Sequence, residues 1–410
     1  MFPAAALLLA FASDSTPTPR APSATEVHDA VRRAQALLLA ARESYAEGGG
    51  RKRPERASAP QPAAQPGPAR EWPYEGVYRV AGDIPLGYRV GGTAIAAVAL
   101  LEAADGAPAG EARAAILGAL DFVLEALGDP RLGPEFVQGY DVRGWGHAYA
   151  LELLLALRAA ELVPEERAVA VEAAIDRLVA LLAQTEIGER GGWNYSRPQG
   201  AASDPSTFMT APTLLVLFKA RAQGEQVDAR VVERALATLE AARQDSGAIQ
   251  YATRAERGKG PRPEAVPGAV GRMAVCEVAL HLAGRGSVER IRGAVSAFFE
   301  HWQWLEQRRK QTGTHVPPYG IAPYYFFFAH RHVAQAIEFL PEAEREGWRT
   351  RLHALLWQVR EESGGWNDRV FPRSESFGTA MTVLALVEPH RPRPAGWSSA
   401  APAAGPAQEK

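Results

Sequence analysis

The residues best suited to acid–base chemistry lie in one aromatic segment, residues 315–332, which ends in a His-x-His sequence. If a helix begins near Tyr324, then Tyr325 and His332 lie on the same face of that helix. Histidine titrates near neutrality, and the pair could act as general acid and base. A hydrogen-bonded pair in the core would show the same spacing. Because His330 points away from His332 around the helix, the sequence predicts no metal site here.

A second candidate group is formed by two carboxylates, Asp368 and Glu375, which flank the start of the last apolar segment. Such carboxylates at the mouth of a site can act as general acid and base. Ion pairs within the loop, or a favourable negative charge at a helix N-terminus, would explain them equally well. We therefore name Tyr325, His332, Asp368 and Glu375 as candidate catalytic residues.

Candidate ligand-binding residues gather in short loops that contain glycine. Three tryptophans each follow a glycine and are flanked by polar or charged residues. Aromatic rings beside cations at the mouth of a site suit a sugar or an anionic head group. Alternatively, each indole packs its loop against neighbouring helices, because Trp buries a large area. The candidate ligand-binding residues are Trp145, Trp193, Trp366, Arg143, Arg197, Tyr324 and Arg373.

Composition excludes several classes of function. The 410 residues include 45 Lys and Arg against 47 Asp and Glu, a net charge of −2, so no basic field exists to hold nucleic acid. No apolar run is long enough to span a membrane. Cys276 is the single cysteine, which excludes an intrachain disulfide and any zinc site with two thiolates. The sequence predicts neither a metal nor a cofactor, and Cys276 reads as a buried core thiol.

The ends of the chain differ from the rest in composition. Residues 1–12 form an apolar stretch that ends in Ala10-Phe11-Ala12, a signal-peptidase pattern that predicts a periplasmic or secreted protein. Residues 13–25 read as a flexible linker, 48–70 as a disordered insertion and 390–410 as a flexible tail, because proline, glycine and alanine dominate them. The remaining chain, residues 26–389, is predicted to be one domain.

The elements that must position the candidate residues are revealed by an internal repeat. Residues 93–100 resemble residues 210–217 and 379–386, and Gly-Gly-Trp-Asn occurs at both 191–194 and 364–367. Both markers fit multiples of one period of about 57 residues. The period predicts about six units, each with a first helix, a Gly/aromatic loop and a more apolar second helix. The first helices begin near Glu26, Glu111, Glu165, Asp228, Ser287 and Glu342, and the second near Tyr88, Trp145, Pro205, Val270, Tyr324 and Ser376.

This pattern predicts an all-α protein with two concentric layers. The first helices have one polar face, which suits an outer ring, whereas the second helices are apolar almost all round and suit an inner ring. An open solenoid needs polar capping repeats at its ends. The last unit is instead as apolar as the third. We therefore predict an α/α toroid of six helical hairpins, closed by packing of the last inner helix beside the first.

Gly-Gly-Trp loops followed by helices with a serine and then Thr-Ala resemble the prenyltransferase/squalene-cyclase repeat. That repeat builds the α/α toroid of terpenoid cyclases and of protein prenyltransferase β-subunits, and the resemblance covers roughly residues 26–389. The Asp-x-Asp-Asp and Asp-Asp-x-x-Asp motifs of terpenoid cyclases do not occur in this chain. The Asp-x-Cys pair of zinc prenyltransferases is missing too, because Ala274 stands two residues before Cys276.

Two functions remain open from the sequence. The first is an exported toroid that binds a small apolar molecule or an extended ligand, such as a glycan, in its central cavity. The second is an enzyme on the same toroid, which transforms an isoprenoid or cleaves a polysaccharide as a lyase does. That enzyme would use Tyr325 and His332 with the two carboxylates. Partner proteins and oligomeric state are not predicted.

Overall fold

The computed structural model describes residues 20–48, 68–188, 190–195, 204–252 and 264–398. These residues form twelve α-helices and no β-strand beyond isolated bridges. None of the described helices combines the length and the apolarity needed to cross a membrane. The predicted signal peptide, most of the 48–70 insertion and the end of the tail lie outside the described residues.

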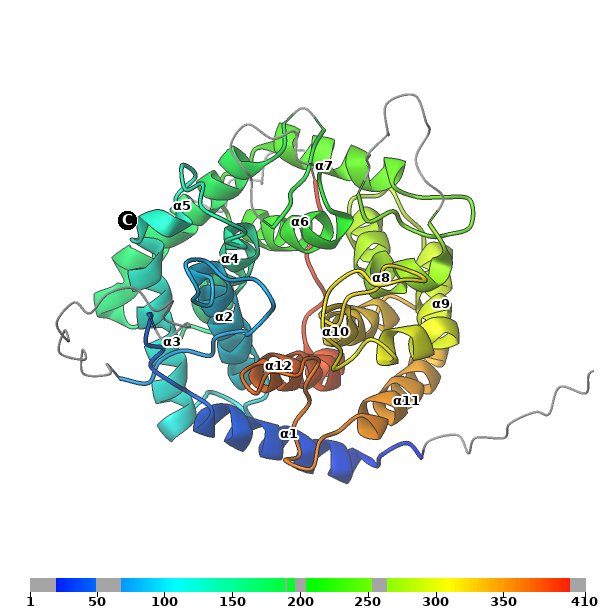
Figure 1. The fold of residues 1–410 in the computed structure, drawn as a ribbon, viewed down its shortest axis with the longest axis horizontal. Coiled ribbons are helices and arrows are strands. Elements are labelled where there is room, and N and C mark those ends of the chain that lie inside the picture. The colour runs from blue at the N-terminus through cyan, green and yellow to red at the C-terminus, as the bar shows by residue number, and fades with distance from the viewer. Residues whose placement is uncertain (1–19, 49–67, 189, 196–203, 253–263, 399–410) are drawn as a thin grey trace, which may run out of the picture.

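The helices form two concentric rings, seen down the common axis in Figure 1. The outer helices are α1 (Ala24–Ala40), α3 (Gly110–Leu127), α5 (Ala168–Thr185), α7 (Ala229–Ala241), α9 (Val288–Glu306) and α11 (Glu342–Gln358). The inner helices are α2 (Leu86–Glu102), α4 (Arg143–Ala159), α6 (Thr207–Ala222), α8 (Val266–Leu282), α10 (Tyr325–Ile337) and α12 (Ser374–Val387).

The burial of the inner and outer helices follows the polarity of their sequences. Every residue of α10 is buried, and α2 is buried from Leu86 to Leu100. In contrast, α5 buries one stripe, which includes Val171, Ile175 and Leu182, and exposes the rest. Each inner helix packs against its two inner neighbours, and α12 packs against both α2 and α1. The predicted closed α/α toroid of six hairpins is therefore confirmed.

A hydrogen-bonded clasp, formed by a tryptophan and a threonine, joins an outer helix to its inner partner in three of the units. The indole N–H donates to a carbonyl in the last turn of the outer helix, and the tryptophan backbone N–H donates to the threonine hydroxyl. The clasps are Trp72 with Leu38 (2.7 Å) and Thr93 (2.9 Å), Trp193 with Leu182 (2.7 Å) and Thr210 (3.0 Å), and Trp366 with Leu356 (2.8 Å) and Thr379 (3.0 Å).

The glycine before two of these tryptophans is required by the clasp itself. A Cβ on Gly192 would lie 2.6 Å from the Thr210 hydroxyl oxygen, and one on Gly365 would lie 2.8 Å from that of Thr379. Gly192 also has a φ of +96°, a backbone conformation that residues with a side chain rarely adopt. The Gly-Gly-Trp and Thr-Ala markers of the sequence are therefore two halves of one contact.

Replacing Thr379 with valine tests the clasp, because valine keeps the shape of threonine but cannot accept the Trp366 N–H. We expect the free energy of unfolding to fall by about 1–3 kcal/mol, the cost of an unpaired buried donor. Thr382 is a matched control in the same helix, since its buried hydroxyl has no hydrogen-bond partner. Thr382→Val should be neutral or stabilising in urea denaturation. Equal losses for both variants would show that the clasp contributes nothing specific.

Candidate functional site

A cavity of about 700 Å³ occupies the centre of the ring. Its deep end is aromatic and lies among the first turns of three inner helices, at Trp145, Phe208 and Phe328. Its mouth lies at the other end, where the C-terminal ends of α2, α4 and α6 and the loops after them contribute residues such as Glu102 and Gln223. Alanine, leucine, valine and proline side chains form much of the wall between them. This volume is in the range of small-molecule binding sites.

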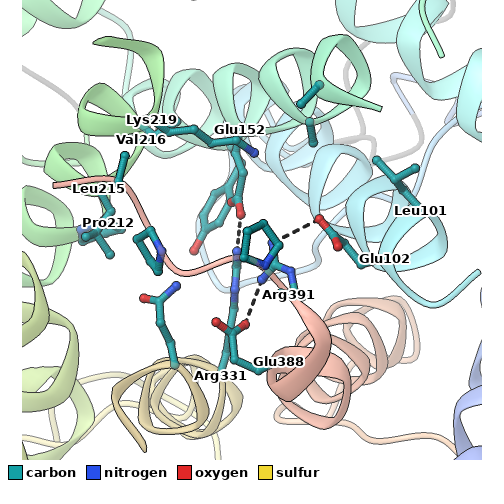
Figure 2. A pocket seen from close by; sticks show the side chains of 18 of the residues that line it. Leu101, Glu102, Glu152, Pro212, Leu215, Val216, Lys219, Arg331, Glu388 and Arg391 are labelled. Carbon is teal, nitrogen blue, oxygen red and sulfur yellow. Dashed lines mark hydrogen bonds and ion pairs between the residues drawn. The ribbon is translucent and has the colours of Figure 1, made fainter. Parts of the chain in front are cut away.

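Charged side chains from four helices converge on this cavity (Figure 2). Arg331 of α10 forms an ion pair with Glu152 of α4 across the ring. Arg391, just after α12, pairs with Glu388 (2.9 Å) and with Glu102 of α2 (3.3 Å). Burial alone would raise the pKa of Glu152, but the charge of Arg331 beside it lowers that pKa. Burial raises the pKa of Glu388, against the opposing charge of Arg391.

Several buried polar atoms on the cavity wall have no hydrogen-bond partner at normal geometry. They are the Tyr149 hydroxyl, both ring nitrogens of His332, Gln335 Oε1 and the Nε atoms of Arg331 and Arg391. Burial lowers the pKa of His332 to about 3, so its ring is neutral at pH 7 and offers one donor and one acceptor. Buried polar groups are normally hydrogen-bonded, so this wall is suited to a polar ligand group or to ordered water.

The segment after α12 runs across the ring, as the red trace near the centre of Figure 1 shows, and its residues 391–395 line the cavity at the mouth. We call residues 391–398 the strap. Arg391 anchors its start through the ion pairs above. At its end, the Trp397 indole N–H donates to Glu233 Oε1 (3.0 Å), its backbone N–H donates to the Leu282 carbonyl (2.9 Å), and its ring stacks on Phe218. The first part of the predicted flexible tail is therefore docked, because one large aromatic side chain finds a hydrogen-bonded site.

The opposite end of the ring holds a cluster of buried tyrosines. The hydroxyls of Tyr195 and Tyr324 are 3.2 Å apart, and His315 lies 3.4 Å from the Tyr324 hydroxyl and 3.5 Å from that of Tyr325. Tyr325 thus faces His315, whereas His332 lines the central cavity. Phe328 lies between them on the same face of α10, in ring contact with His332 at 4.4 Å. The two candidate catalytic side chains share a face of α10 but occupy different surroundings.

Asp368 lies fully buried beside this cluster. The Tyr74 hydroxyl donates to its Oδ2 (3.1 Å), Arg369 Nε donates to the Tyr74 oxygen (3.2 Å), and Asp368 Oδ1 has no partner. Burial raises the pKa of Asp368 to about 7, although the charge of Arg369 opposes this. Glu375 makes no hydrogen bond with Asp368 and instead accepts one from the Ser363 hydroxyl. The structure therefore places the two carboxylates apart.

The candidate ligand-binding residues fall into separate places. Trp145 lines the cavity, while Trp193 and Trp366 belong to the clasps and are fully buried. Arg143 is buried near Asp141 of its own loop, with 3.5 Å between Nε and Oδ1, and Arg373 pairs with Glu43 at 2.6 Å. Tyr324 belongs to the tyrosine cluster, and Arg197 lies outside the described residues.

Sequence reasoning missed the charged groups of the cavity wall, above all Glu152, Lys219 and Arg331. A signal for them does exist, because each is a charged residue within a largely apolar inner helix. As for metals, no group of three His, Cys, Asp or Glu side chains within the described ranges could hold an ion. Cys276 is buried, and burial raises its pKa to about 12.

The raised pKa of Asp368 predicts a pH-dependent stability. The pKa rises from the ordinary 3.8 to about 7 on folding, so between these values the native state holds a proton that the unfolded chain has lost. The contribution of Asp368 to the free energy of unfolding is fully present below pH 4 and is lost as the pH rises from 4 through 7. We expect Asp368→Asn to gain on the order of 3 kcal/mol relative to the native protein between pH 4 and pH 8. Urea denaturation of both proteins across that pH range measures this gain. If the two free energies of unfolding differ by the same amount at every pH, the raised pKa of Asp368 is contradicted.

No protein-family model matches the chain, and no curated protein sequence matches it either. Solved structures do match. An inactive variant of the α-1,6-mannanase GH76A of Salegentibacter sp. HEL1_6 has a TM-score of 0.55 at 11% identity and covers 88% of this chain and 99% of its own. A D-mannose isomerase has a TM-score of 0.50 at 12% identity, with 90% and 98% covered.

A type II terpene cyclase, MstE from Scytonema, matches with a TM-score of 0.48 at 15% identity, covering 90% of this chain and 98% of its own. At such identities the likeness concerns the fold alone. The likeness to the mannanase and to the isomerase agrees with the repeat pattern and with the closed ring. The chain therefore has an α/α toroid fold.

Proposed function

We propose that this protein binds a small molecule with an apolar body and a polar end in its central cavity. The observation that carries this proposal is the set of unpartnered polar atoms on the wall of an otherwise apolar cavity. A ligand with no polar group would leave these atoms unpaired, at a cost of about 1–3 kcal/mol for each one that water could not reach. A fully polar ligand would lose its hydration against Phe208, Phe328 and Trp145 without compensation.

The arrangement of the wall supports one orientation of the ligand. The aromatic side chains lie at the deep end, whereas the charged and amide groups lie nearer the mouth, on the later turns of α4, α6 and α10. An apolar body would therefore point into the ring and the polar end toward the strap. Because the strap crosses the mouth, a bound molecule would be largely enclosed.

A second candidate function is catalysis at the tyrosine end of the ring. It is favoured by Asp368, a buried carboxyl that titrates near neutrality, has one free oxygen and touches the Tyr74 hydroxyl. Such a group can act as a general acid or base. The substrate would be an isoprenoid or a glycan, and the similar mannanase was solved in complex with α-1,6-mannotriose.

Export belongs to the proposal as well. Its support is the Ala10-Phe11-Ala12 pattern after an apolar stretch, followed by a Ser/Thr/Pro-rich spacer. Mass analysis of the mature N-terminus of protein purified from its own host tests it. A chain that begins at Ser13 would support export, whereas an intact residue 1 in material from the cell interior would refute it.

The cavity proposal is tested first by native mass spectrometry of the purified protein, followed by solvent extraction. We expect a mass above that of the chain, released as a small molecule. After extraction, the cavity should bind the neutral apolar dye N-phenyl-1-naphthylamine. Ala156→Phe fills the cavity wall and should weaken dye binding by about tenfold or more, equivalent to about 1.4 kcal/mol.

Ala173→Phe is the matched control, because Ala173 is exposed on the outer helix α5. This variant should bind the dye as the native protein does. If the protein is empty and Ala156→Phe binds the dye as well as the control, the central cavity is not the binding site. In that case the tyrosine end of the ring is the place to test.

A further inference from the structure

Lys219, which is partly buried, differs from Arg331 and Arg391 on the cavity wall, because it has no ion pair. Arg331 is paired with Glu152, and Arg391 is paired with Glu102 and Glu388. No acidic side chain of the described residues lies within ion-pair distance of the Lys219 ammonium group. Figure 2 shows this side chain near Glu152, with no dashed line for an ion pair between them.

The surroundings of Lys219 do not compensate its charge. Burial lowers the pKa of Lys219. The attraction of Glu152 and Glu102 opposes this only partly, and the positive charges of Arg391 and Arg331 add to the lowering. Its place in the last turn of α6 is favourable for a cation. That placement stabilises the charge along the helix but provides no hydrogen-bond acceptor for the ammonium group. Lys219 is only partly buried, so water can reach its ammonium group, and a bound carboxylate would supply an acceptor of opposite charge in place of that water.

Uncharged donors and acceptors lie on the same wall. The Tyr149 hydroxyl comes from α4, and His332 and Gln335 come from α10. The His332 ring is neutral at pH 7 and can donate one hydrogen bond. Lys219 adds one cation without an ion pair to a cavity that also holds these neutral donors, whereas Arg393 of the strap, also without an ion pair, is exposed. This wall suits a single negative charge. A second negative charge would meet Glu152, Glu102 and Glu388, which also line the cavity.

We propose that the ligand of the central cavity is a monoanionic amphiphile whose carboxylate pairs with Lys219. This inference rests on the proposed function, because it names the head group of the molecule that the cavity takes. The apolar body extends toward Phe208 and Phe328, and the carboxylate receives hydrogen bonds from the Lys219 ammonium group and from the neutral donors beside it. The ion pair forms inside the ring, away from bulk water, where it is stronger than at a surface.

The test compares two probes with the same apolar body, dodecanoic acid and 1-dodecanol, by displacement of N-phenyl-1-naphthylamine at pH 8. We expect the full-length protein to bind the acid about tenfold or more tightly than the alcohol, the scale of a charge-assisted hydrogen bond. Lys219→Met keeps the length of the side chain but removes the charge. It should weaken binding of the acid by about tenfold and change binding of the alcohol less than about twofold.

Two variants serve as controls. Lys219→Arg keeps the positive charge and should retain the preference for the acid. Lys310→Met removes a lysine that is paired with Glu361 at 2.6 Å and does not line the cavity, so it should leave both affinities unchanged. If Lys219→Met fails to fold, the comparison of acid with alcohol in the native protein still decides, because it needs no variant.

The possible failures are distinguishable. Equal affinity for acid and alcohol in the native protein overturns the carboxylate inference and leaves the proposed function standing. An equal loss of both affinities in Lys219→Met overturns it too, because Lys219 would then act on the shape of the cavity. If the dye binds but neither probe displaces it, the carboxylate inference fails. If the dye itself does not bind in the cavity, the proposed function fails.

Discussion

The whole arrangement depends on the hydrogen-bonded clasp between a tryptophan and a threonine. A single tryptophan ties the end of an outer helix to the start of the next inner helix, through its indole and its backbone N–H. The units that contain Trp72 and Trp366 are the first and the last, and they meet where α12 packs against α1 and α2. Two clasps therefore flank the closure of the ring, the place where an open solenoid would expose its ends.

The cavity is a consequence of that closure. Six inner helices arranged in a ring cannot all pack at its axis. The faces that these helices turn to the axis are therefore covered only by their own side chains. Alanine at 148 and 156 leaves space there, while Trp145, Phe208 and Phe328 fill the deep end. The polar groups of the wall come from different units, which is why the cavity is asymmetric although the fold repeats.

The fold could be predicted from the sequence because two of the three clasps require glycine before the tryptophan, and all three use a threonine in the helix that follows. Those requirements appear as repeated strings. The wall of the cavity has no such signature, since Glu152, Lys219 and Arg331 are single residues on three helices. Only the geometry of the ring brings them together. In the same way, the composition of the tail predicts mobility, but Trp397 docks it.

The pairing of Tyr325 with His332 shows a second limit of sequence reasoning. Helical periodicity places both residues on one face of α10, and the structure agrees. However, seven residues span about 10 Å along a helix axis. One face of an inner helix therefore passes through two environments, the tyrosine cluster and the central cavity. Periodicity gives the direction in which a side chain points but not the depth at which it lies.

Burial acts on the titratable groups of the interior in one sense only. It lowers the pKa of His332 and Lys219 and raises that of Asp368, so each group is driven toward its uncharged form. A ring interior of this kind favours net neutrality. Arg331 and Arg391 reach it through carboxylates of the chain itself. Lys219 has no carboxylate in direct contact, although Glu152 and Glu102 attract it from further away. A bound carboxylate would give its ammonium group the direct partner that the described part of the chain does not provide.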